Sequence, residues 1–314
     1  MPDAPNPDQL RALLRPLAAE GDEPEMFRAY RAYYGLDFPA RGDSVRSRLG
    51  CVQVAGHCVA TQAWWPREPR GTLVLLHGYY DHMGLYRHVI DWALGLGFAV
   101  IACDLPGHGL SSGAPASIGD FAEYQATLTA LLGEAGRLEL PAPWHLAGQS
   151  TGGAIVLDFL LNGAVPDGLG RSLLFAPLVR PRAWGWSKFS YRMLRPFVES
   201  IPRRFSVNSS DAEFIDFVHN RDPLQPRKLP TAWVGALARW VPYIEASAPC
   251  GHSPLVIQGD ADMTVDWRHN LRVLDDKFAS PEVLMLEGAG HHLVNEAAHY
   301  RERYFAFLRE RLGL

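Results

Sequence analysis

Short apolar runs alternate along the chain with longer segments whose apolar positions recur at helical spacing. The runs comprise residues 72–77, 98–103, 144–148, 171–176, 254–259 and 282–287. They are too short for helices and show little alternation with polar residues, which is typical of strands buried on both faces. The helical segments comprise residues 85–97, 121–136, 152–163, 268–278 and 295–312. This order predicts an α/β fold with a mostly parallel central sheet and helices on both faces.

Two segments interrupt this alternation. Residues 1–45 contain two helical pieces that precede the sheet, and their apolar positions would be costly to expose to water. We therefore expect this N-terminal helical extension to pack on the core or on a partner subunit. Residues 178–248 carry many aromatic and arginine side chains and are too long for a loop, so they predict a helical cap insert. The α/β core then comprises residues 46–177 and 249–314.

Composition narrows the classes of function. The chain is 47% hydrophobic with a net charge of −4, which gives no reason to expect nucleic acid as a partner. Its four cysteines form no C-x-x-C motif and suggest no metal site. No apolar run approaches the roughly 18 residues of a membrane-spanning helix, and no secretory signal is visible. We expect a cytoplasmic protein, and the oligomeric state stays open.

Ser150 lies between a predicted strand and a predicted helix, in the segment "WHLAGQSTGGAIVLDF". Gly148 and Gly152 flank it in a G-x-S-x-G pattern. In this context the glycines allow a sharp turn that holds the serine hydroxyl outward. The N-terminal amides of the following helix favour negative charge at the same place. A helix cap is the alternative role for this serine, but the strand–turn–helix context favours a nucleophile.

A nucleophilic serine needs a base to accept its proton and an acid to orient that base. Two later strand ends supply candidates, namely Asp260, Asp262 and Asp266 at one and His291 and His292 at the other. The order serine, acid, histidine is that of a known class of serine hydrolases. The acids also suit helix caps, Asp266 in particular, and the paired histidines suit a surface turn. Three pieces in the required order favour a catalytic set.

Five motifs together carry a family resemblance: "LLHGYYDHMGLYRHV", "VIACDLPGHGLSSG", "GQSTGG", "GDADMTVD" and "EGAGHHLVNE". They resemble the monoacylglycerol lipase and lysophospholipase branch of the α/β-hydrolase superfamily, from about residue 75 to the C-terminus. The resemblance weakens in the insert and is not evident in residues 1–45. It implies the α/β-hydrolase fold and a hydrolase of carboxylic esters, lipid-like ones of the monoacylglycerol or lysophospholipid type. No metal or organic cofactor is implied.

The resemblance makes Ser150 the nucleophile, Asp262 the acid and His291 the base. It favours Asp262 over Asp260 because the family pattern is a glycine, two residues and then the acid. It favours His291 over His292 because "EGAGH" matches the family's run up to its histidine.

The resemblance also places the oxyanion hole at the backbone amides of Tyr79 and Thr151. The family often has a small residue at the position of Tyr79, so we expect this ring to shape the acyl entrance. Further motif residues are expected to shape loops and turns rather than to take part in the chemistry, namely His77, His82, Asp104, His108 and Asp222.

Several activities share this triad. A general small-ester esterase, a thioesterase, a peptidase and an acyltransferase all use it, and a ligand-binding receptor that kept the triad is the alternative outside enzymes. A serine nucleophile argues against haloalkane dehalogenases and most epoxide hydrolases.

The insert has an unusual local charge. Residues 180–204 hold seven basic side chains and one acid, interleaved with aromatic residues. One interpretation is a cap helix whose aromatics cover the site while its basic residues face water. The other is an apolar acyl tunnel with a basic rim, which attracts anionic head groups or a membrane surface.

Overall fold

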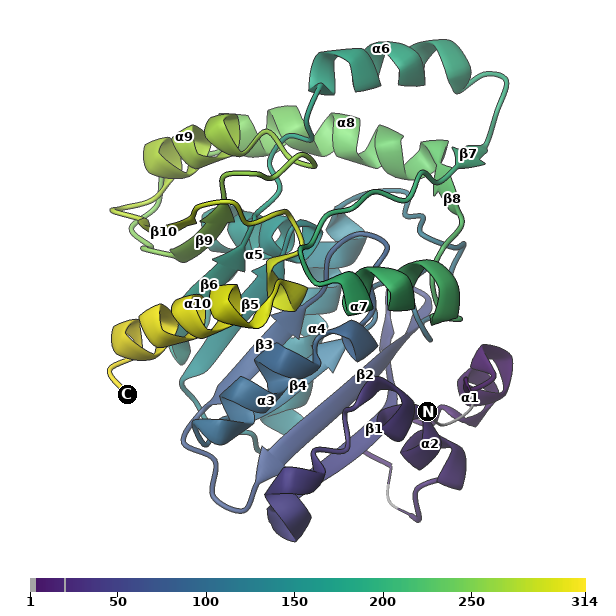
Figure 1. The fold of residues 1–314 in the computed structure, drawn as a ribbon, viewed down its shortest axis with the longest axis vertical. Helices are drawn as coiled ribbons and strands as arrows, with labels where there is room; N and C mark the ends of the chain where they lie inside the picture. The colour runs from purple at the N-terminus through teal and green to yellow at the C-terminus, as the bar shows by residue number, and fades with distance from the viewer. Residues whose placement is uncertain (1–3, 20) are drawn as a thin grey trace.

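Eight strands form the central sheet of the computed structural model, which describes residues 4–19 and 21–314 (Figure 1). The strands of this sheet are β1 (Val45–Val54), β2 (His57–Pro66), β3 (Thr72–Leu76), β4 (Ala99–Cys103), β5 (Trp144–Gln149), β6 (Leu169–Phe175), β9 (Leu255–Gly259) and β10 (Glu282–Leu286). Their order is β1-β2-β4-β3-β5-β6-β9-β10. β2 is antiparallel to both β1 and β4, and all other pairs are parallel. The predicted, mostly parallel α/β-hydrolase sheet is confirmed.

Burial follows the position of each strand in the sheet. Every residue of β3, β4 and β9 is buried, as their apolar runs predict. β10 was also expected to be buried. Only its last residue, Leu286, is buried, and Val283 is 40% exposed. β10 lies at the edge of the sheet with β9 as its single neighbour. An apolar run therefore does not distinguish an edge strand from a central one.

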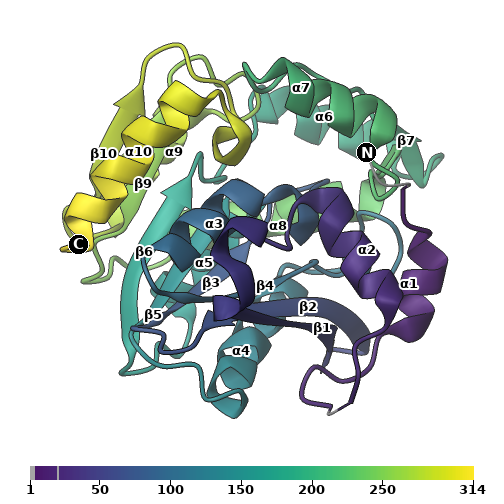
Figure 2. The same cartoon turned by 60° about the horizontal axis from the view of Figure 1, so that its bottom comes forward.

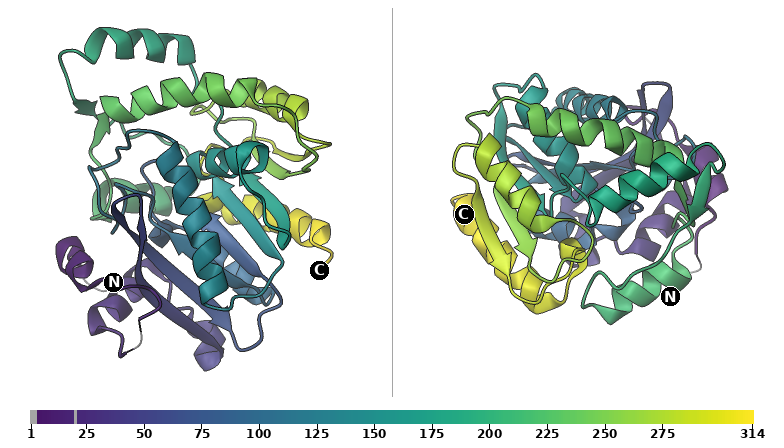
Figure 3. Two further views of the ribbon diagram at one scale, coloured as in Figure 1. Left: turned by 180° about the vertical axis from the view of Figure 1, so that it is seen from behind. Right: turned by 90° about the horizontal axis from the view of Figure 1, so that it is seen from above.

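Helices cover both faces of the sheet (Figures 1 and 3). One face is covered by α3 (Arg87–Gly95) and α10 (Ala298–Arg311), and the other by α4 (Ala122–Arg137), α5 (Thr151–Asn162) and α9 (Trp267–Lys277). Successive side chains of a strand point to opposite faces, so Val74 and Leu76 join one apolar core while Leu73 and Leu75 join the other. Short 3₁₀ turns, η2 (Met83–Leu85) and η4 (Leu293–Asn295), precede α3 and α10.

The N-terminal extension packs on the core of its own chain. It comprises α1 (Pro7–Leu13), α2 (Glu25–Tyr34) and the 3₁₀ segment η1 (Pro39–Ser44), which lie beside β1 and β2 (Figure 2). Leu10 and Tyr30 are fully buried in the same core as Leu73. Of the two partners expected for this segment, the structure provides the core. Residues 1–3 and 20 of the predicted extension lie outside the described residues.

The insert lies over one end of the sheet (Figure 1). Its elements are α6 (Trp184–Leu194), β7 (Ser200–Pro202), α7 (Ala212–Asp216), the π-helical η3 (Phe217–Arg221), β8 (Lys228–Pro230) and α8 (Thr231–Ala246). α8 joins the core through Trp233, Leu237 and Trp240. α6 lies outside α8, and Trp184 is its one buried residue. Within the described part of the chain, no helix is both long and apolar enough to cross a membrane.

Candidate active site

Ser150 occupies a strained turn between β5 and α5. Its backbone angles are φ 52° and ψ −108°, a region that non-glycine residues seldom adopt. A Cβ on Gly148 would lie 2.3 Å from the backbone of Gly152, and one on Gly152 would lie 2.2 Å from the carbonyl oxygen of Leu76. Both positions therefore require glycine. The Ser150 side chain makes no capping hydrogen bond to α5, so the alternative prediction that this side chain caps the helix is wrong.

His291 and Asp262 form a buried pair. His291 Nδ1 lies 2.7 Å from Asp262 Oδ2, and Asp262 Oδ1 accepts hydrogen bonds from the backbone N–H groups of Thr264 and Val265. Burial alone would raise the pKa of Asp262, but His291 and the two N–H groups hold it below its ordinary value. Asp262 is thus kept ionised where it orients the imidazole ring.

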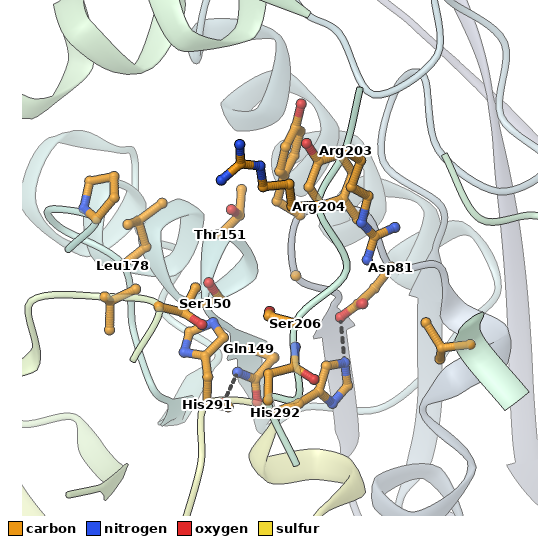
Figure 4. A pocket seen from close by; sticks show the side chains of 18 of the residues that line it. Asp81, Gln149, Ser150, Thr151, Leu178, Arg203, Arg204, Ser206, His291 and His292 are labelled. Carbon is orange, nitrogen blue, oxygen red and sulfur yellow. Dashed lines mark hydrogen bonds and ion pairs between the residues drawn. The ribbon is translucent and has the colours of Figure 1, made fainter. Parts of the chain in front are cut away.

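Ser150 and His291 line one cavity of about 330 Å³ (Figure 4). Figure 4 shows the serine side chain beside the imidazole ring. Among the described residues no hydrogen bond joins them, and such bonds often tighten only when substrate is bound. The side-chain amide of Gln149 donates to the carbonyl oxygen of His291 at 2.8 Å, which ties the histidine loop to the serine turn.

The other acids at these strand ends have different contacts. Asp260 is exposed and accepts a hydrogen bond from the backbone N–H of Gly288 at 2.7 Å. Asp266 caps α9 by accepting from the N–H of His269 at 3.3 Å. Of the three candidates, the structure therefore pairs only Asp262 with a histidine side chain.

A second histidine–carboxylate pair lies in the same cavity and was not predicted. His292 Nε2 lies 2.9 Å from Asp81 Oδ2, and the Tyr86 hydroxyl donates to the same oxygen at 2.9 Å. Burial alone would raise the pKa of Asp81, yet His292 holds it well below its ordinary value. The neighbouring histidines and the acid of "HGYYD" were visible in the sequence, but their separation in the chain concealed the pairing.

The two backbone N–H groups expected to form the oxyanion hole are those of Tyr79 and Thr151. In the described chain, neither the Tyr79 nor the Thr151 N–H has a hydrogen-bond acceptor. His77 stabilises the loop before Tyr79, because its Nε2 accepts from the N–H of Leu105 at 2.8 Å. Burial lowers the pKa of His77 to about 3, so the ring is neutral and suited to accept. The hydroxyl of Tyr86 accepts from the Gly78 N–H at 2.8 Å.

The ring of Tyr79 is fixed between two elements. Its hydroxyl donates to the carbonyl oxygen of Ala116 at 2.7 Å, and its face stacks on Trp233 of α8. The ring therefore lines the cavity and also joins the loop to the insert.

His82 joins three parts of the chain. We expected it to bond to backbone near the site, and it does accept from the Gly84 N–H, at 3.2 Å. It also pairs with Asp222 of the insert at 2.9 Å, and Asp222 accepts from the Tyr34 hydroxyl of α2 at 2.8 Å. Both side chains of the pair are fully buried. Asp104 shapes a turn as expected, by accepting from two backbone N–H groups.

The basic residues of the insert are mostly remote from the cavity. Only Arg203 and Arg204, of the seven between 180 and 204, line it. Arg180 instead pairs with Glu245. The expected basic rim is thus reduced to two side chains. In the described part of the chain, no group of three or more acidic, histidine or cysteine side chains is placed to hold a metal ion.

Comparison with known proteins gives a consistent result. The family model described as serine aminopeptidase S33 matches residues 67–298. The chain is 29% identical to a monoacylglycerol lipase of Mycolicibacterium smegmatis, over 81% of this chain and 92% of that protein. It is 26% identical to the Homo sapiens monoglyceride lipase, over 78% and 83% of the two chains.

Solved structures show the same fold. A soluble variant of the Saccharomyces cerevisiae monoglyceride lipase, in complex with a substrate analog, superposes with a TM-score of 0.72 at 18% identity, over 84% of this chain and 94% of that one. The Paleococcus ferrophilus monoacylglycerol lipase gives 0.68 at 20% identity, over 83% and 98%.

Proposed function

The chain belongs to the serine aminopeptidase S33 family of α/β-hydrolases and is a carboxylic ester hydrolase, and on this premise we propose that it cleaves monoacylglycerol-type or lysophospholipid-type esters through Ser150, His291 and Asp262. The observation that carries the proposal is the buried His291–Asp262 pair beside a serine on a strained turn. The lipase names of the relatives favour an ester substrate over a peptide.

The proposed mechanism follows from the contacts of His291. Because Nδ1 bonds to Asp262, Nε2 is left to take the proton of the Ser150 hydroxyl. The serine oxygen attacks the acyl carbonyl, and the N–H groups of Tyr79 and Thr151 stabilise the negative oxygen. His291 then gives its proton to the departing alcohol, which leaves an acyl-enzyme. A water molecule repeats the cycle and releases the acid.

The walls of the cavity support a lipid-like substrate. The lining includes the apolar side chains of Leu178, Leu229, Trp233 and Val265. Such a wall suits an acyl chain, because its transfer from water contributes roughly 0.8 kcal/mol per buried CH₂ group.

The outer face of α6 supports peripheral membrane contact as part of this proposal. Trp186 is 70% exposed and Phe189 56% exposed, and Lys188 lies between them. Exposed aromatic side chains beside basic ones are typical of helices that lie on an anionic lipid surface. A membrane would be the source of the proposed substrate.

Burst kinetics with a p-nitrophenyl acyl ester test the catalytic proposal. The wild-type protein should release p-nitrophenol in a burst and then turn over, while Ser150→Ala and His291→Ala should lose at least about 10³ in kcat with unchanged folding. Two results together would exclude the proposed nucleophile. The burst of p-nitrophenol would not scale with enzyme concentration, and Ser150→Ala would not change the release. A panel of acyl-chain lengths then measures the preference for lipid-like chains.

A further inference from the structure

We infer that Arg203 and Arg204 bind an anionic phosphate group on the alcohol part of the ester substrate. The inference rests on the proposed function and selects, from the two ester types named there, the one that carries a phosphate. Four observations support it: an arginine in the cavity without a partner, a second arginine held in place, a carboxylate that is already paired, and an apolar side chain, Leu178, across the cavity.

Arg204 is the cation without a partner. Its side chain lines the cavity, and Figure 4 shows the guanidinium extending over the space above Thr151. Within the described chain it makes no ion pair, hydrogen bond or ring contact. Some other basic side chains of the insert have partners that do not line the cavity, such as Arg180 on Glu245 and Arg195 over the Tyr191 ring. Arg204 is exposed to solvent, so water screens part of its attraction to a ligand that supplies negative charge and paired acceptors.

Arg203 is held in place by its neighbours. Its guanidinium lies 4.0 Å from the ring centroid of Tyr80 and 4.4 Å from that of Phe205. Nη1 donates to Gln225 at 2.7 Å and to the carbonyl oxygen of Pro226 at 3.2 Å. No described group accepts from Nε or Nη2, so these donors stay available on a side chain that is already ordered. Ordering before binding lowers the entropy that a ligand must offset.

The carboxylate that shares the cavity with these arginines is already paired with other groups. Asp81 lines the same cavity, but its Oδ2 accepts from the Tyr86 hydroxyl and pairs with His292. No ion pair joins it to Arg203 or Arg204 among the described residues. Asp81 offsets part of the charge of Arg203 without forming an ion pair with it, so two guanidinium groups and one carboxylate leave this part of the cavity positive.

The acyl chain and the alcohol of the substrate are therefore assigned to different parts of the cavity. On the other side of Ser150 from Arg203, Leu178 lines the cavity and suits the acyl chain, so we place the anion on the alcohol (Figure 4). Neutral glycerol would leave both guanidinium groups without a counter-charge. A glycerol phosphate supplies charge and several acceptor oxygens.

Matched substrates test the inference. We would measure kcat/KM for a 1-monoacylglycerol and for the 1-acylglycerol 3-phosphate with the same acyl chain, at low ionic strength and with monomeric substrate. The wild-type protein should prefer the phosphate ester at least tenfold, and this preference should fall as salt is added. In Arg204→Gln the ratio of the two values should fall about tenfold, mainly through KM for the phosphate ester, and Arg204→Lys should retain part of it.

Arg28→Gln is the matched control, because it removes one positive charge from an exposed position on α2. Its substrate ratio should equal that of the wild type. A wild-type preference for the monoacylglycerol, or an unchanged ratio in Arg204→Gln, would overturn the inference. The third substrate is an ester with the same acyl chain and a carboxylate on the alcohol. A higher kcat/KM for this ester than for the phosphate ester would overturn the choice of phosphate.

A binding measurement separates this inference from the proposed function. Glycerol 3-phosphate should raise the Tm of the wild type at low salt and leave the Tm of Arg204→Gln less changed. If the protein bound this probe but hydrolysed no ester, the proposed function would fail and the phosphate site would stand. If the wild type hydrolysed esters but Arg204→Gln bound glycerol 3-phosphate equally well, the phosphate site would be wrong and the proposed function would stand.

Discussion

The rings of Tyr79 and Trp233 stack with their centroids 3.7 Å apart and their planes 17° from parallel. Tyr79 belongs to the core loop that follows β3, and Trp233 lies in the first turn of α8. The backbone N–H of Tyr79 is one of the two proposed oxyanion donors. One aromatic contact therefore links the position of that donor to the position of the insert.

Removing this contact should slow the chemical step more than it weakens binding. We expect Trp233→Ala to lower kcat by about tenfold or more, because loss of one oxyanion donor costs about 10²–10³ and here the donor is displaced rather than removed. Trp233→Phe keeps an aromatic face and should recover most of kcat.

Leu229→Ala is the comparison for Trp233, since it also changes the apolar wall contributed by the insert. It should act mainly on KM. Steady-state kinetics on one ester measure both constants, and an effect of Trp233→Ala confined to KM would contradict the positioning role.

The proposed acid can be distinguished from its neighbour by substitution. Asp262→Asn removes the charge that orients His291 and should lower kcat by about 10²–10⁴. Asp260→Asn should change kcat by less than about threefold, because Asp260 accepts from the Gly288 N–H and does not contact the histidine. The same p-nitrophenyl assay serves both variants. Greater sensitivity at Asp260 would reassign the acid.

The buried Asp222–His82 pair should make stability depend on pH. Burial alone would lower the pKa of His82, but Asp222 raises it, and His82 holds the pKa of Asp222 below its ordinary value. The contribution of His82 to the free energy of unfolding is complete below about pH 6.5 and is lost as pH rises through the raised pKa of His82. The aspartate contribution is present above about pH 4 and is lost as pH falls through the lowered pKa. The pair therefore stabilises most between these values.

Asp222→Asn should accordingly lower the free energy of unfolding by about 3 kcal/mol at pH 5.5 and by less at pH 9. Urea unfolding at the two pH values measures the difference. Asp216→Asn, at an exposed position of α7, should cost less than about 1 kcal/mol at either pH. An equal loss for Asp222→Asn at both pH values would mean that the pair acts through packing alone.

The N-terminal extension should contribute to stability through Tyr30. This side chain is fully buried, so Tyr30→Ala should lower the free energy of unfolding by about 3–5 kcal/mol. Its hydroxyl has no hydrogen-bond partner among the described residues. Tyr30→Phe should therefore be neutral or slightly stabilising, because it removes a buried polar atom without opening a cavity. Chemical unfolding compares the two variants, and a large loss in Tyr30→Phe would reveal a partner for the hydroxyl.

Vesicle co-sedimentation tests the proposed membrane face of α6. The wild type should sediment with anionic vesicles at low salt, less so at high salt, and weakly with neutral vesicles. Trp186→Ser with Phe189→Ser should lower binding to anionic vesicles severalfold, since two exposed aromatic side chains no longer insert. Equal sedimentation of the double variant would place the contact elsewhere.

Much of the fold was determined by neighbouring residues in the sequence. The apolar runs of β3, β4 and β9 and the glycines around Ser150 act through periodicity and local sterics, which need no knowledge of distant segments. The α/β class, the turn at Ser150 and the presence of an insert could therefore be predicted. The resemblance of five motifs then favoured one acid and one histidine among several.

Only the tertiary structure decided which distant groups meet. It paired Asp262 with His291 and Asp81 with His292, and it placed β10 at an edge. Of seven basic residues in one segment, it turned two toward the cavity. These outcomes depend on contacts across as many as 211 positions of the chain, as for His292 and Asp81. Residue type and local spacing can suggest such a contact, as for Asp262 and His291, but they do not fix it, because the packing of the whole core sets it.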